Sequence, residues 1–218
     1  QKVNSAAGIH VKDILSGVVY SPEEVSYKLK GFENQCRLRV KNTIIVLVNF
    51  QEIRKTLRDN KEPFSSFIRE IKTEFPDCFF FNPLGTLHFT LAAQNVTEES
   101  VPKVEKLLQG KKSFQVVLKG FTITDFINGR VFLNVKAEYD DIKSVLTDYG
   151  SMHYKESRIG FLNLKRNLTD LEKKRLERIL KKYQDKIMLK FDAKKVSIVE
   201  QDNSLMISPK VISEITLV

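Results

Sequence analysis

The chain has 218 residues, of which 42% are hydrophobic and 29% are charged. This composition excludes a disordered chain and predicts one globular domain, or two small lobes that share one core. The apolar runs are far shorter than the roughly 18 residues that a membrane span needs, and the first residues lack the apolar region of a signal peptide. We therefore expect an intracellular protein, cytoplasmic or nuclear, that contacts no membrane.

The net charge of +9 is concentrated between Lys165 and Lys195, where 12 basic residues stand against 5 acidic ones. One interpretation is a solvated helix face. The other is a surface for a phosphate-rich partner such as RNA or a nucleotide. Protein partners are left open by the sequence. Two cysteines, Cys36 and Cys78, are too few for a disulfide framework and lack metal-binding spacing, so we expect buried thiols.

In the first half of the chain, residues 1–40 give a weak pattern, with a short strand expected near Ile14 to Tyr20 and a helix start at Ser21. Beyond them, apolar periodicity and turn residues predict alternating strands and helices. The strands are expected at 44–50, 78–81 and 87–92, and the helices at 51–75, interrupted at Pro63, and at 97–108.

The second half repeats this order and contains the strongest hairpin signal, Asn128-Gly129, which predicts two antiparallel strands around it. Mixed order together with this hairpin indicates an α+β fold rather than a doubly wound parallel sheet. The strands are expected at 114–118, 121–127, 130–135, 158–164, 187–199 and 205–217, and the helices at 140–149 and 169–184.

His88 is the most informative of the three histidines. Side chains alternate along a strand, so His88, Thr90 and Ala92 are expected on one face, with Leu87, Phe89 and Leu91 on the core face. An imidazole and a hydroxyl two residues apart suit the binding of one phosphate, because the hydroxyl donates to an oxygen while the imidazole moves a proton. A structural, half-buried strand histidine is the alternative.

The stretch from Cys78 to Leu108, and above all Leu87-His88-Phe89-Thr90-Leu91, resembles the first motif region of the 2H phosphoesterases. This family includes the LigT-like RNA 2′,3′-cyclic phosphodiesterases and 2′,5′-phosphodiesterases. The resemblance covers residues 41–218 and leaves 1–40 as an N-terminal extension. It implies a two-lobed fold with antiparallel sheets around a groove and helices outside, the lobes being roughly 41–112 and 113–218, with strand exchange between them as an option.

The resemblance also implies a reaction without metal or cofactor. Each lobe supplies one His-x-Thr/Ser motif, one histidine acting as general base and the other as general acid, while the hydroxyls hold the phosphate.

The second motif is degenerate in this sequence. Arg158 stands at the histidine position and Gly160 at the hydroxyl position of the matching strand. Arginine stays protonated near neutral pH and cannot exchange protons as a general acid or base, although it binds phosphate in a bidentate manner. His153 and Lys155, in the preceding loop, are further candidate groove residues.

Three functions follow from these expectations. The first is a metal-independent phosphodiesterase with His88 and Thr90 as catalytic residues, and with Arg158 and Thr90 as phosphate ligands. It would act on RNA ends or oligonucleotides with 2′,3′-cyclic or 2′,5′ linkages. The second is an inactive module that binds RNA or nucleotide, and the third is a protein-interaction domain in which His88 is structural.

Overall fold

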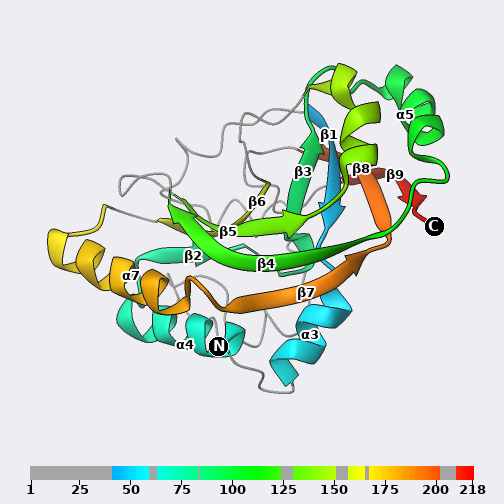
Figure 1. Ribbon diagram of the computed structural model, residues 1–218. Helices are drawn as coiled ribbons and strands as arrows, with labels where there is room; N and C mark the ends of the chain where they lie inside the picture. The colour runs from blue at the N-terminus through cyan, green and yellow to red at the C-terminus, as the bar shows by residue number, and fades with distance from the viewer. Residues whose placement is uncertain are drawn as a thin grey trace, which may run out of the picture.

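The computed structural model describes residues 41–58, 63–82, 84–123, 130–150, 157–164, 167–201 and 210–218. Within these ranges the chain forms two antiparallel sheets with helices packed around them, so the expected α+β class is confirmed (Figure 1). The expectations for residues 1–40, for the Asn128-Gly129 turn and for His153 and Lys155 lie outside the described residues.

The four-stranded sheet has the order β3-β1-β8-β9. It joins β1 (Lys41–Leu47) and β3 (His88–Ala92) to β8 (Lys195–Gln201) and β9 (Lys210–Thr216). β1 is rich in β-branched residues and lies between β3 and β8. Ile44 is completely buried there, as an apolar strand in the interior of a sheet should be.

The five-stranded sheet has the order β2-β6-β5-β4-β7, with every neighbouring pair antiparallel. Its strands are β2 (Phe79–Phe81), β6 (Arg158–Leu164), β5 (Arg130–Ala137), β4 (Phe114–Ile123) and β7 (Ile187–Ala193). Each of the two sheets thus combines strands from early and late parts of the chain.

Among the described helices, α4 (Phe64–Glu74) and α7 (Asp170–Tyr183) lie side by side, and Phe67 of α4 contacts Phe121 of β4 and Tyr183 of α7 (Figure 1). None of the helices described combines the length and the apolar character needed to traverse a lipid bilayer. The remaining helical elements are α3 (Phe50–Arg58), η1 (Leu84–Thr86), η2 (Glu98–Ser100), α5 (Val101–Leu108), α6 (Asp140–Val145) and η3 (Thr147–Tyr149).

Aromatic side chains hold α4 and α7 against the five-stranded sheet. The Phe67 ring stacks on Phe121 at 4.6 Å between centroids, and Phe64 lies 5.6 Å from Phe161 of β6. Full burial of each such ring contributes about 1.5–3 kcal/mol relative to leaving it exposed. This packing fixes which face of the five-stranded sheet is the core face, and therefore which face is left for a binding site.

The expected boundary between strands 114–118 and 121–127 is wrong because of a local backbone irregularity. Residues 114–123 form one strand instead of two, because a bulge at Lys119-Gly120 lets the pairing with β5 continue past it. Gly120 has a φ of +80°, which glycine adopts without the steric cost that a side chain brings.

Residues 187–199 form two strands in different sheets, where the sequence predicts one. Burial alternates at Leu189, Phe191 and Ala193 of β7, whereas residues 196–199 of β8 are all buried, and the exposed Lys194 and Lys195 separate the two patterns. The chain passes there from the five-stranded to the four-stranded sheet, and Lys194 accepts a backbone hydrogen bond from Leu217.

A small polar cluster joins α4 to α7. The Glu70 carboxylate accepts hydrogen bonds from Lys182 Nζ at 2.7 Å and from the Tyr183 hydroxyl at 2.9 Å. Burial raises the pKa of Glu70, but these two hydrogen bonds and the charges of Lys182 and Arg178 outweigh it, so the pKa lies below its ordinary 4.5. The ionised form therefore stabilises the folded state above that pH.

We expect Glu70→Gln to lower Tm by about 2–4 °C at pH 7, because a charged acceptor of two hydrogen bonds is lost. The difference from wild type should shrink as pH falls below 4.5, since wild-type Glu70 then becomes protonated too. Thermal unfolding at several pH values measures both effects. Glu177→Gln, an exposed glutamate of α7, is the matched control and should leave Tm nearly unchanged; equal shifts in the two variants would contradict the assignment.

Candidate functional site

β3 holds His88 and Thr90 on the face opposite the core. Leu87 and Phe89 are buried at 1% and 0% exposure, whereas His88 and Thr90 are both half-buried. The alternation expected for these four residues is therefore present. Ala92 differs from the expectation: a register shift between Ile44/Ile45 and β3 turns it toward the main core, where it is completely buried.

The imidazole of His88 is oriented by one backbone group. Its Nδ1 lies 2.8 Å from the carbonyl oxygen of Thr86, and no second hydrogen bond to the ring appears in the described residues. A carbonyl only accepts, so Nδ1 carries the proton and donates it. In the neutral ring Nε2 then holds the lone pair, which is the arrangement that a general base needs.

The surroundings of His88 favour the neutral ring. Burial lowers the pKa of His88 most, the hydrogen bond to Thr86 raises it by less, and the positive charge of Arg130 lowers it further. The net pKa lies below the ordinary 6.5. At neutral pH the ring is therefore ready to accept a proton and poorly suited to donate one.

Arg130 is a site residue that the sequence did not reveal. It opens β5, pairs with Asn163 of β6, and lies close enough to His88 to act on its charge. Its position on the strand after the Asn128-Gly129 turn was visible in the sequence. Its closeness to His88 depends on how the two sheets pack, for which the sequence holds no local signal.

Arg158 occupies the strand that faces β3. β3 and β6 contact each other although they belong to different sheets, and Arg158 is half-buried opposite Asn134 of β5. Asn134 also accepts a hydrogen bond from the Thr122 hydroxyl at 2.8 Å. The structure thus brings the strand with Arg158 and the strand with His88 and Thr90 into contact.

Gly160, at the position of the missing hydroxyl, has room for a side chain. A Cβ built there would lie 3.7 Å from the Phe132 ring and 3.9 Å from Asn82 Nδ2, which are ordinary van der Waals distances. The absence of a hydroxyl residue at this position is therefore not imposed by packing.

A buried pair of amides fixes β6 beside Gly160. Asn82 donates through Nδ2 to the Gly160 carbonyl at 3.1 Å and through its backbone N–H to the Phe161 carbonyl at 3.0 Å. Asn163 Nδ2 in turn donates to Asn82 Oδ1 at 2.7 Å. These bonds lie where the β5–β6 register shifts, so they hold the irregular part of the strand.

On the sheet face that carries His88 and Thr90, the residues in the middle of β1 and β8 are buried. Thr90 pairs with Ile45 of β1, and Ile45 pairs with Ser197 of β8. The side chains of Ile45 and Ser197 are at most 2% exposed. Thr43 and Val199, paired on the same face, are equally buried. Exposure returns at both edges of this face, toward His88 and Thr90 of β3 and toward Val211 and Glu214 of β9.

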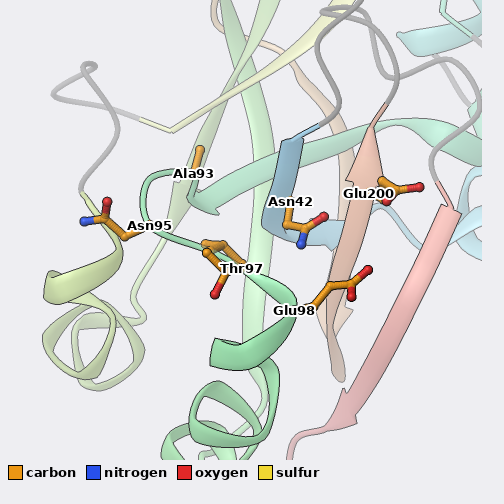
Figure 2. A pocket seen from close by; sticks show the side chains of 7 residues that line it. Asn42, Ala93, Asn95, Thr97, Glu98 and Glu200 are labelled. Carbon is orange, nitrogen blue, oxygen red and sulfur yellow. The ribbon is translucent and has the colours of Figure 1, made fainter.

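A separate pocket of about 400 Å³ lies at the other end of β1 (Figure 2). Figure 2 shows Asn42 of β1, Glu200 of β8 and Glu98 of the turn before α5 around its opening. Its two carboxylates, Glu98 and Glu200, disfavour an anionic ligand such as phosphate in this pocket. In the ranges that the structure describes, no three His, Cys, Asp or Glu side chains gather as metal ligands.

No protein-family model matches the sequence, and no curated protein matches it. Solved structures match by fold. TT0787 of Thermus thermophilus aligns with a TM-score of 0.55 and 14% identity over 81% of this chain and 97% of that one. E. coli LigT in complex with NADP+ aligns with a TM-score of 0.53 and 13% identity, over 82% of this chain and 98% of the LigT chain. A structure described as a phosphoesterase aligns with a TM-score of 0.50 and 12% identity, over 82% of this chain and 99% of that one.

We expect the NMR titration of His88 to give a midpoint below 6.5, because burial is the largest influence on its charge. Arg130→Met should raise this midpoint, since a nearby positive charge is removed, while leaving it below 6.5. Ring-proton shifts measure both, and with only three histidines in the chain His88→Gln assigns the signal. A midpoint at or above 6.5 in the wild type would contradict the environment described here.

Proposed function

Because the chain has the LigT-like fold of the 2H phosphoesterases, we propose that the β3–β6 site binds the phosphate of a nucleotide or RNA end. We further propose that it hydrolyses 2′,3′-cyclic or 2′,5′ linkages slowly with one histidine. The observation that supports this proposal is the His88 ring, whose Nδ1 lies 2.8 Å from the Thr86 carbonyl oxygen, together with Thr90 on the same half-buried face of β3 and the contact between β3 and β6.

Phosphate binding would use groups from both strands. Thr90 contributes a hydroxyl donor, and Arg158 and Arg130 contribute guanidinium groups, which suit the oxygens of a phosphate. LigT structures of the same fold contain NADP+, ATP and phosphate, which supports a ligand of this chemical class. No metal or cofactor is part of the proposal.

Hydrolysis would run with a base and without a matching acid. Nε2 of His88 accepts a proton from water as the water oxygen bonds to phosphorus, and the bond to the 2′ or 3′ oxygen breaks. The leaving oxygen takes its proton from solvent, because the guanidinium of Arg158 stays protonated. The arginines and Thr90 stabilise the charge that develops on the phosphoryl oxygens.

The inactive binding module is the second candidate, and the replacement of both residues of the second motif favours it. A missing acid or base costs about 10²- to 10⁴-fold in rate. Both candidates share the phosphate site, and they differ only in turnover.

We expect the wild type to hydrolyse a nucleoside 2′,3′-cyclic phosphate or a 2′,5′-linked dinucleotide slowly, and His88→Ala to reduce this rate at least about 10²-fold because the base is lost. Product formation followed by chromatography measures the rate, and calorimetry measures binding. Binding without turnover would select the inactive module. If neither ligand binds, the proposal fails.

We also expect Arg158→His with Gly160→Thr to raise the rate by about 10²-fold or more, because the pair supplies the acid and the second hydroxyl. Gly160 can take the new Cβ without a clash. Each single variant is a control that restores only half of the motif. Unchanged turnover in a double variant that folds and binds would show that β6 does not present these positions to the reacting phosphate.

A further inference from the structure

α7 carries a line of positive charge on its outer side. Lys174, Arg178 and Lys181 are exposed and follow each other at intervals of four and three residues. This spacing places them on one stripe of the helix surface. Seven residues at about 1.5 Å each make the stripe about 10 Å long.

Other basic residues of the same helix are already paired. Lys182 contacts Glu70 at 2.7 Å, Arg175 contacts Glu74 at 4.0 Å, and Lys173 contacts Asp170 at 3.0 Å. Across the described ranges, the three residues of the outer stripe have no carboxylate at ion-pair distance. Arg178 also acts electrostatically on Glu70, and the exposed Glu177 lies on the same face of the helix, three residues after Lys174 and four before Lys181. The stripe nevertheless keeps a net positive charge that faces solvent.

The apolar side of α7 is already used by the core. Leu176 and Ile179 are buried at 0% and 2%, and Tyr183 packs against Phe67. A helix that lies in a membrane surface needs this side for lipid. Only Leu171, at the start of the helix, exposes a large apolar side chain, at 60%. The stripe is thus suited to a polyanion in water and not to a bilayer.

The stripe lies apart from the phosphate site. α7 lies beside α4 (Figure 1), and α4 packs on the core face of the five-stranded sheet through ring contacts with Phe121 and Phe161. Arg158 and Gly160 alternate with the core residue Ile159, so they belong to the opposite face. Ligands at the two places do not overlap.

We propose that Lys174, Arg178 and Lys181 form a binding surface for the phosphate backbone of single-stranded RNA. Three cations spread over about 10 Å can contact up to three phosphates of a flexible single strand. Lysine and arginine at such a surface contact the phosphates and not the base edges. Binding is therefore independent of the RNA sequence and weakens as the salt concentration rises. The surface would hold the body of an RNA and acts separately from the β3–β6 site.

The test uses the full chain and a fluorescent RNA of about 12 nucleotides, long enough to cover the stripe, with hydroxyl groups at both ends, followed by anisotropy at several salt concentrations. The variant is Lys174→Gln, Arg178→Gln and Lys181→Gln, since glutamine keeps helix propensity. We expect the slope of log K against log salt to fall by about 2, at about 0.7 per contact, and Kd to weaken about 10- to 100-fold near 0.1 M salt.

The control removes the same charge elsewhere. Lys103, Lys106 and Lys112 are exposed on and after α5, and their triple change to glutamine should leave the slope nearly unchanged. Equal losses in the two triple variants, no RNA binding by the wild type, or stronger binding to phosphatidylserine vesicles than to RNA would each overturn the proposal.

Two further measurements separate this surface from the β3–β6 site. The α7 variant should keep the wild-type behaviour toward a nucleoside 2′,3′-cyclic phosphate. His88→Ala should keep the RNA affinity and its salt slope. Loss of RNA binding in His88→Ala with an unaffected α7 variant would place the RNA at the β3–β6 site and overturn the proposal.

Discussion

The site depends on the alternation of side chains along two strands whose other faces are locked in the core. Phe89 of β3 and Ile159 and Phe161 of β6 are completely buried. Their burial leaves His88, Thr90 and Arg158 no choice of side, because neighbouring side chains in a strand point to opposite faces. A slip of one residue in either strand would place an imidazole or a guanidinium in the core, which burial of unpaired polar groups makes costly.

The same packing decides the chemistry of His88. Burial and the nearby charge of Arg130 lower the pKa of His88 by more than the hydrogen bond to the Thr86 carbonyl raises it, so the neutral form dominates at neutral pH. An imidazole in this state is a base. On β6, Arg158 offers a permanent cation at the position where the resemblance to the 2H phosphoesterases implies a second imidazole. The balance between binding and turnover therefore depends on how well solvent replaces the missing acid.

The sequence predicted much of this arrangement because the relevant signals were local. The motif strand, the helix broken at Pro63 and the helix from Thr169 all follow from periodicity and boundary residues, and the Thr169 hydroxyl accepts a capping bond from the Glu172 backbone. The two motif strands needed the family resemblance as well, since local periodicity does not say which strands meet.

What the sequence missed depends on contacts between distant segments. Register shifts occur at the bulge at Gly120 and at Ala92, where the sequence predicts regular pairing. At Lys194 the chain passes from one sheet to the other within a stretch that the sequence predicts as a single strand. The effect of Arg130 on His88 and the burial of the middle of β1 and β8 arise only once the sheets are assembled. No window of sequence contains both partners of these interactions.

The amide pair at Asn82 and Asn163 has a consequence for how such a site changes over time. Asn82 holds β6 through the carbonyls of Gly160 and Phe161, which are main-chain atoms that every amino acid possesses. The backbone path of β6 therefore does not depend on which side chains stand at positions 158 and 160. Substitutions at these two positions can alter reactivity while the scaffold persists, so a domain of this shape can lose, regain or exchange its chemistry without having to evolve a new fold.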